Sequence, residues 1–177
     1  MSKPKDNNFN FTLRPRINFI SLKNDYYNKK AHASIGFEIE YVFPMNHKKW
    51  SVFIDPNYSY VGYNKHEKRG DVDIYLKFHT IEVPVGVRYS LALKNKSKIY
   101  INAVCIFDIN LDSSIKIERK IIRYTSSRVL KRDPGFAFGL GYKFKDTYSI
   151  EARATTNRNH GLGNYNITSI ILGYRIF

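Results

Sequence analysis

The sequence contains a single cysteine, Cys105, among 177 residues. An intrachain disulfide and a cysteine-based zinc site are therefore both excluded. No stretch of about 18 consecutive apolar residues is present, so the chain has no candidate transmembrane helix. The five histidines are scattered without metal-ligand spacing, and no glycine-rich loop leads into a helical pattern as a phosphate-binding fingerprint requires. We therefore expect neither a metal nor another cofactor.

Acidic residues are scarce relative to basic ones. Asp and Glu number 15 against 29 Lys and Arg, which gives a formal net charge of +14. Such an excess attracts anionic partners, and both glycolipid phosphates and nucleic acid have the right charge. Because no nucleic-acid-binding motif accompanies the charge, we expect no specific nucleic-acid partner. Residues 1–8 are polar and lack the apolar core of a secretory signal, so we expect a tail without a signal peptide, then one domain over 9–177.

The abundant feature is a strict alternation of apolar and polar residues. In the segment 31–43, apolar residues at odd positions alternate with polar ones that include Glu38 and Glu40. A slip of one residue would bring both glutamates into the apolar face, so the register is well defined. Period two predicts β-strands, and no helical pattern competes with it. Eight segments show it: 9–19, 31–43, 50–60, 80–91, 99–111, 136–144, 148–155 and 169–177.

The connections between the eight segments alternate in length. They are short after the second, fourth and sixth segments, and long at 23–30, 64–73, 112–134 and 157–164. Outer-membrane barrels have short periplasmic turns on one rim and longer external loops on the other. The sequence therefore predicts an all-β fold, an eight-stranded antiparallel up-and-down transmembrane β-barrel, which we expect to be a monomer.

Alternation alone does not distinguish this barrel from a soluble or periplasmic, lipocalin-like ligand-binding barrel, whose faces are exchanged. Charge placement favours the membrane barrel, because the polar phase of the strands holds six acidic and six basic residues. Balanced charge suits a closed interior in which each buried ion needs a partner. We predict a lumenal ion-pair network of Arg14, Arg16, Glu38, Glu40, Asp55, Glu82, Arg88, Asp108, Lys143, Glu151, Arg153 and Arg175.

Small and aromatic residues add detail to this prediction. Glycines in the polar phase would leave room for long charged side chains, so we expect a filled lumen without a conducting pore. Aromatic residues near the short turns are predicted to form a girdle at the membrane interface. They are Tyr41, Phe43, Trp50, Tyr89 and Phe144.

Three prolines lie within predicted strands, at Pro15, Pro56 and Pro84. A closed barrel has no edge at which a missing N–H is harmless. We therefore expect each proline near a rim or at a bulge.

Several segments carry a family resemblance: FIDPNYSY (53–60), IEVPVGVRYSL (81–91), KIYINAVCIFDINLDSSI (98–115), FAFGLGYKF (136–144) and IILGYRIF (170–177). Through them, nearly the whole chain resembles the outer-membrane β-barrel domain proteins common in the Bacteroidetes group. The resemblance implies a place in the cell outer membrane, among its lipid and lipopolysaccharide. It also implies insertion by the barrel-assembly machinery, with Phe177 as the assembly signal. Arg175 departs from the aromatic or apolar residue usual at the third position from the end.

The segment 112–134 is the most basic connection, with seven basic residues against three acidic ones. Ile115 and Ile117 continue the apolar phase of the preceding segment, which indicates that strands five and six extend beyond the bilayer as a hairpin. Such a hairpin could bind lipopolysaccharide phosphates, an extracellular glycan or a protein, and a solvated loop without a partner is the alternative. The predicted binding residues are Lys116, Arg119, Lys120, Arg123, Arg128, Lys131 and Arg132.

A catalytic alternative rests on His32, Ser34 and Glu38, which share one strand face. Some outer-membrane barrels are lipid A hydrolases that use Ser, His and an acid. Neighbours on one strand face lie about 7 Å apart, too far for a preformed triad. We therefore expect no enzyme, but an outer-membrane barrel with a filled polar lumen and a structural or surface-interaction role through basic external loops.

Overall fold

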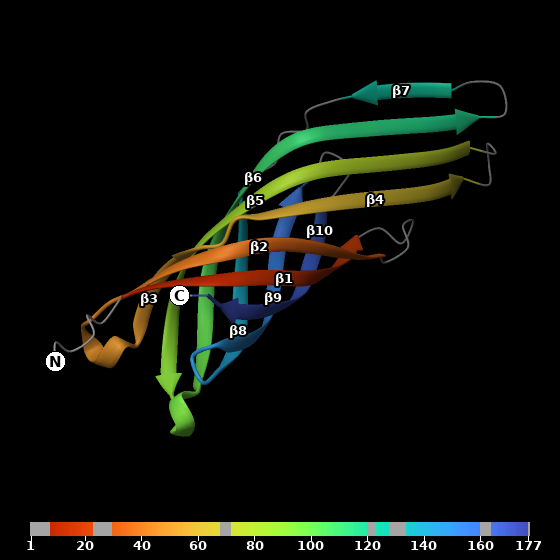
Figure 1. Ribbon diagram of the computed structural model, residues 1–177. Helices are drawn as coiled ribbons and strands as arrows, with labels where there is room; N and C mark the ends of the chain where they lie inside the picture. The colour runs from red at the N-terminus through yellow and green to blue at the C-terminus, as the bar shows by residue number, and fades with distance from the viewer. Residues whose placement is uncertain are drawn as a thin grey trace.

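The computed structural model describes residues 8–22, 30–67, 72–119, 123–127, 134–159 and 164–176. These residues form strands and two single-turn 3₁₀ helices (Figure 1). The elements are β1 (Phe9–Leu22), β2 (Lys30–Val42), η1 (Asn46–Lys48), β3 (Trp50–Ile54), β4 (Asn57–Glu67), β5 (Val72–Ala92), η2 (Lys94–Lys96), β6 (Lys98–Arg119), β7 (Arg123–Ser127), β8 (Gly135–Phe144), β9 (Tyr148–Asn159) and β10 (Asn164–Arg175).

The strands close into an antiparallel barrel. β1 pairs with β2 on one side and with β10 on the other, and the ring continues through β9, β8, β6 and β5. Between β5 and β2, the ring is completed by β3 and β4, which form one strand interrupted at Asp55 and Pro56. The barrel therefore has eight strands, as the alternation predicted. Its short turns, after β2, β5 and β8, lie on one rim.

Three strands of the ring, β4, β5 and β6, continue beyond it, and β7 joins them in a projecting sheet (Figure 1). β4 and β5 pair as far as Glu67 and Val72, β5 and β6 pair as far as Val72 and Arg119, and β7 pairs with the end of β6. The connection predicted at 64–73 is strand over 64–67 and 72–73, so that prediction was wrong there, and β9 likewise extends to Asn159. The predicted extension of the fifth strand is present, since β6 continues to Arg119 and its end pairs with β7. Backbone pairing continues there although charged residues interrupt the sequence alternation.

The prolines occupy interruptions of the strand pairing. Pro56 stands between β3 and β4, and the backbone N–H of Asp55 donates to the carbonyl oxygen of Pro84 at 2.9 Å. The missing N–H of Pro84 would point to the same gap, so the two interruptions coincide. Pro15 differs from the prediction because it lies in the middle of β1. There the ladder to β10 pairs Leu13 and Arg16 but skips Pro15 without a register shift.

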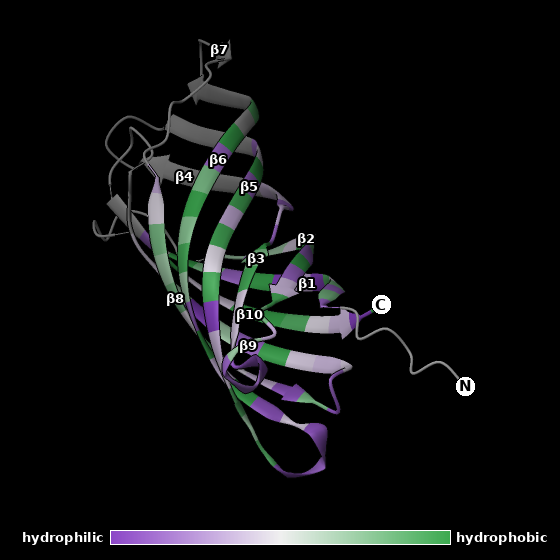
Figure 2. Ribbon diagram, turned by 90° about the vertical axis from the view of Figure 1, so that its left-hand side faces the viewer, coloured by the Kyte–Doolittle hydropathy of each residue, from purple (hydrophilic) through white to green (hydrophobic). Residues whose placement is uncertain are grey.

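The two faces of the barrel wall have opposite polarity. Leu13 is 40% exposed on the outside, whereas the adjacent Arg14 is 1% exposed in the lumen. The same alternation of apolar and polar residues runs along the strands in Figure 2. A soluble barrel with an apolar lumen would show the reverse, so that alternative was wrong.

Among the described ranges, no helix has both the length and the apolar character needed to cross a membrane.

Candidate functional site

Four arginines and four carboxylates fill the centre of the lumen. β1, β5 and β9 supply the arginines, and β2, β9 and the interruption between β3 and β4 supply the acids. Each is at most 5% exposed, so the charges have little water to solvate them and must solvate one another. The central network consists of Arg14, Arg16, Arg88, Arg153, Glu38, Glu40, Asp55 and Glu151.

Arg14 joins strands that are not paired with each other. Its guanidinium donates to Glu38 on the neighbouring strand β2 and to Glu151 on β9, and Asp55 lies 3.7 Å away. Three carboxylates from three parts of the chain therefore surround one cation. This arrangement links the N-terminal and C-terminal thirds of the barrel across its lumen.

Arg88 forms the second centre of the network. Its two terminal nitrogens donate to the two oxygens of Glu38 at 2.9 and 2.7 Å, and one of them also donates to Glu40 at 2.9 Å. Its Nε donates to Asn102 at 2.9 Å. The guanidinium carbon lies 4.7 Å from the ring centroid of Phe53 and 4.3 Å from that of Tyr100. The cation is thus held both by carboxylates and by two aromatic rings.

Asp55 is the third centre and has no solvent exposure. Arg16 donates to one of its oxygens at 2.7 Å and Arg153 donates to the other at 3.0 Å. Arg153 also donates to Glu151 at 2.8 Å. Because Asp55 stands at the interruption before Pro56, the break in the strand places this carboxylate in the lumen between two arginines.

The network reaches toward the short-turn rim through Glu40. Lys143, on β8, lies 3.2 Å from this carboxylate and is 12% exposed at its side chain. Ser51 and Asn10 also donate to Glu40, at 2.7 and 3.0 Å. One carboxylate therefore collects a lysine, an arginine and two neutral donors.

The structure brings together nine of the twelve residues predicted for the lumen. The remaining three, Glu82, Asp108 and Arg175, are half-buried in the wall. Glu82 and Asp108 are register partners on β5 and β6, toward the projecting sheet. Arg175 is the register partner of Thr12 near the short-turn rim.

The basic segment and the assembly signal are described only in part. Lys116 and Arg119 lie on β6, and Arg123 lies on β7. Lys120, Arg128, Lys131, Arg132 and Phe177 lie outside the described residues.

Apolar side chains in the lumen escaped the sequence reasoning. Phe53, Val104, Ile106 and Ala137 form a buried cluster, and Tyr100 is 2% exposed. These residues occupy lumenal positions that alternation identifies, but their apolar character conflicts with a purely polar interior. The sequence did contain a signal for Phe53 and Tyr100. Each lies two positions before a polar lumenal residue, Asp55 or Asn102, and therefore on the same strand face.

The lumenal glycines provide space for particular side chains. A Cβ on Gly141 would stand 2.2 Å from the Tyr100 ring, and one on Gly139 would stand 2.6 Å from a Glu151 oxygen. A Cβ on Gly86 would meet the Phe53 ring at 2.7 Å. The glycines therefore admit the aromatic rings that flank Arg88 as well as the charged side chains.

The residues of the catalytic alternative have structural partners. Ser34 accepts a hydrogen bond from Asn18 at 2.9 Å, and Asn18 also accepts one from Ser169 at 2.7 Å. Glu38 is bound by two arginines, as described above. Among the described residues, no group of three or more His, Cys, Asp or Glu side chains is arranged to hold a metal ion.

Aromatic side chains gather near the short turns, and their place in a girdle at the membrane interface stays a prediction. The Trp50 and Tyr89 rings lie 4.9 Å apart, and the Tyr41 and Phe43 rings 5.5 Å apart. The Nζ of Lys145 lies 5.0 Å from the centroid of Phe144.

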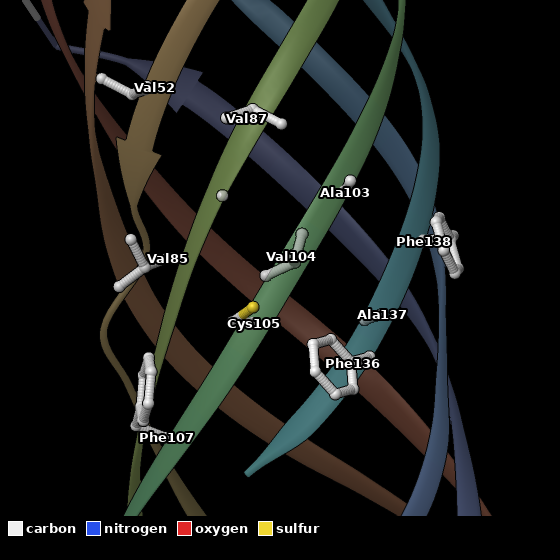
Figure 3. Close-up of a pocket in the computed structure, with 11 residues that line it drawn as sticks. Val52, Val85, Val87, Ala103, Val104, Cys105, Phe107, Phe136, Ala137 and Phe138 are labelled. Carbon is white, nitrogen blue, oxygen red and sulfur yellow. The ribbon is translucent and has the colours of Figure 1, made fainter.

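A shallow apolar hollow of about 620 Å³ lies on the outer face across β3, β5, β6 and β8 (Figure 3). Small residues, including Ala103 and Cys105, form its floor, and Val85, Phe107 and Phe136 stand around it. The hollow is separate from the lumenal network and offers only apolar surface.

An apolar outer wall, a charged and filled lumen and short turns on one rim together define an outer-membrane β-barrel. Residues 4–164 match the family described as outer membrane protein beta-barrel domain, and the chain belongs to that family. The protein is thus one of the cell outer membrane.

Solved structures show the same fold. Neisserial surface protein A (NspA) is similar with a TM-score of 0.57 and 11% identity, covering 96% of each chain. Ail, the attachment invasion locus protein of Yersinia pestis, is similar with a TM-score of 0.51 and 16% identity, covering 95% of this chain and 97% of Ail. Ail has also been crystallised with the heparin analogue sucrose octasulfate. No curated protein matches the chain significantly.

Proposed function

We propose that this barrel is a surface-interaction protein whose projecting sheet binds anionic ligands outside the cell. The observation that carries the proposal is the extension of β4, β5, β6 and β7 beyond the barrel ring (Figure 1). β6 has 22 residues, whereas a strand needs about 9 to 11 residues to cross the membrane. The additional residues of β6 are not needed to cross the membrane or to close the barrel.

The charge of this region supports an anionic ligand. The segment 112–134 has seven basic and three acidic residues. It includes β7 and the projecting end of β6, so part of this positive charge lies on the projecting sheet. Lipopolysaccharide phosphates and sulfated or carboxylated glycans are the ligand chemistries that such charge favours. The complex of Ail with sucrose octasulfate is a parallel from a protein of the same fold.

The filled lumen supports an interaction role over a transport role. The central network leaves four arginines and four carboxylates in mutual contact, and two aromatic rings close around Arg88. We infer that the barrel is also not an enzyme, since Glu38 is bound by two arginines and Ser34 by an asparagine. The barrel then acts as a rigid base for the projecting sheet.

Further features of the proposal rest on the sequence. A Bacteroidetes-type origin, a monomeric state and insertion by the barrel-assembly machinery through Phe177 stay predictions. Binding of an extracellular protein to an edge of the projecting sheet is the alternative within the same role.

The test is retention on immobilised heparin and on lipopolysaccharide-coated surfaces in detergent. The triple variant Lys116→Gln/Arg119→Gln/Arg123→Gln should elute from heparin at a clearly lower salt concentration than the wild type, because released counterions set the salt dependence. The matched control Lys49→Gln/Lys94→Gln/Lys96→Gln removes the same charge at the opposite rim and should elute at a higher salt concentration than the projecting-sheet variant. Equal elution of all three proteins would contradict the proposal and favour a purely structural role.

A further inference from the structure

The short-turn rim, opposite the projecting sheet, carries a concentration of lysines. Its three turns have the sequences FPMNHKKW (43–50), LALKNKSKI (91–99) and KFKDTY (143–148). They contain seven lysines and a single acidic residue, Asp146. The lysines are Lys48 and Lys49 in the first turn, Lys94, Lys96 and Lys98 in the second, and Lys143 and Lys145 in the third.

The turns are neighbours on the rim. Ser90 donates its backbone N–H to the carbonyl oxygen of Lys49 at 2.7 Å, which joins the first turn to the second. Lys98 is the register partner of Lys143 and lies 2.9 Å from Asp146, which joins the second turn to the third. The lysines therefore form one continuous basic arc around the rim.

The available carboxylates are engaged by the two lysines that flank the lumen. Asp146 pairs with Lys98, and Glu40 inside the lumen pairs with Lys143. Apart from Asp146, the sequences of the three turns contain no acidic residue. Lys94, Lys96 and Lys145 are exposed and Lys49 is half-buried. Their positive charge is therefore accessible to molecules next to the rim.

The aromatic residues place this arc at the level of lipid headgroups. Trp50 follows Lys49 directly, is 43% exposed on the outer wall and contacts Tyr89. Lys145 lies over the Phe144 ring. Such aromatic side chains sit at the boundary between hydrocarbon and headgroups, and lysines beside them are within reach of lipid phosphates.

We propose that this arc binds anionic phospholipid headgroups in the periplasmic leaflet of the outer membrane. Short turns of outer-membrane barrels face the periplasm. Because each 3₁₀ turn spans only three residues, the lysines stay close to the membrane surface and do not project toward the cell wall. The ligand chemistry is a lipid phosphate with net negative charge, as in phosphatidylglycerol.

Trp50 is the only tryptophan of the chain and stands in this arc, so its fluorescence reports the lipids at this rim. The protein is refolded in vesicles of phosphatidylcholine and phosphatidylglycerol in equal amounts, with either one or the other lipid brominated. Attraction of lysines to an anionic surface predicts quenching about twofold stronger when phosphatidylglycerol carries the bromine. High salt should reduce this difference.

Two triple variants of equal charge separate a local site from net charge. Lys49→Gln/Lys94→Gln/Lys96→Gln should lose the preference for phosphatidylglycerol. Lys65→Gln/Lys77→Gln/Lys116→Gln, on the projecting ends of β4, β5 and β6, should keep it. Heat-shifted gel mobility verifies that each variant is folded, and Lys94→Gln alone, in an exposed turn, provides a milder version with a partial loss.

The proposal is overturned if the two brominated lipids quench Trp50 equally in the wild type, or if both triple variants lose the preference to the same extent. It is also overturned if the rim lysines mediate sedimentation with isolated peptidoglycan while no lipid preference exists, since the arc would then contact the cell wall. The lipid preference does not require the projecting sheet to bind a ligand, so this test and the heparin test can fail separately.

Discussion

Arg88 binds Glu38 through two parallel hydrogen bonds, 2.9 and 2.7 Å long, in the centre of the lumen. Each side chain is at most 3% exposed. A planar guanidinium facing a carboxylate in this way is the strongest geometry available to an ion pair in a protein. The two residues are 50 positions apart, on β5 and β2. These strands are not paired with each other, because β3 lies between them on one side of the interruption and β4 on the other. The pair therefore ties together strands that the backbone ladder does not join.

Removing Arg88 should destabilise the barrel strongly. Arg88→Ala leaves Glu38 with Arg14 alone and Glu40 with Lys143 as its remaining cation, in a lumen almost without water. Breaking a buried ion pair by deleting one partner costs about 3 to 5 kcal/mol. Urea unfolding of the refolded protein in lipid vesicles measures this loss of unfolding free energy.

The rim pair of Lys98 and Asp146 provides the control for Arg88. Both side chains are about one-third exposed, at 33% and 32%. Lys98→Ala should lower the unfolding free energy by no more than about 1 kcal/mol, since exposed pairs contribute little. A similar small effect of Arg88→Ala would show that the central network does not stabilise the fold.

Gly141→Ala should conflict with Tyr100. A Cβ at position 141 would lie 2.2 Å from the Tyr100 ring, which is held between the wall and Arg88. We expect a loss of about 1 to 3 kcal/mol from overpacking, measured by the same urea titration. In a Tyr100→Ala background, Gly141→Ala should lower the unfolding free energy by much less than it does in the wild type. An equal cost in both backgrounds would contradict the contact as the cause.

The sequence was sufficient for the barrel because each strand in the membrane alternates apolar and polar residues. A residue such as Glu38 can occupy only the lumenal phase once Phe37 and Ile39 face outward, so period two identifies both the strand and the side that faces the lumen. The projecting ends of β4 and β5 were missed because no bilayer requires an apolar outer face there, whereas Ile115 and Ile117 indicated the extension of β6. Charges such as Lys65 and Asp73 interrupt the alternation although the backbone pairs continuously.

The members of the network were predictable, but not their pairing. Phase places Arg14, Arg88 and Glu151 in one lumen, whereas the contacts among them depend on strand tilt and stagger across the barrel. Phe53 and Tyr100 were missed because a polar lumen was assumed to contain only polar side chains. Their rings flank Arg88, so burial of a guanidinium requires apolar neighbours as well as carboxylates.

The filled lumen predicts that the protein conducts no steady ion current. Arg88 with its carboxylates and the Phe53 and Tyr100 rings occupy the middle of the barrel. Planar-bilayer recordings of the refolded wild type should show no discrete channel openings. The double variant Phe53→Ala/Tyr100→Ala removes two rings that fill the lumen. Its ion current is compared with that of the wild type. Stable openings of the wild type would show that the network rearranges to admit ions.

The position of Cys105 allows a direct test of which wall face contacts lipid. Its side chain is partly exposed on the outer wall, whereas Val104, one residue earlier, is 4% exposed in the lumen. A thiol-reactive fluorophore on Cys105 should be quenched by lipids brominated in the middle of the acyl chain and not by aqueous iodide, because successive strand residues face opposite sides.

The variant Val104→Cys/Cys105→Ser moves the thiol by one residue and into the packed lumen. If it folds, as judged by heat-shifted mobility, its thiol should react far more slowly with the same reagent until the barrel is unfolded in urea. Rapid labelling at position 104 together with quenching of both probes by iodide would mean that the wall is not oriented as described. Slow labelling at 104 and lipid quenching at 105 would establish, from two adjacent residues, that the apolar face is the one that the membrane covers.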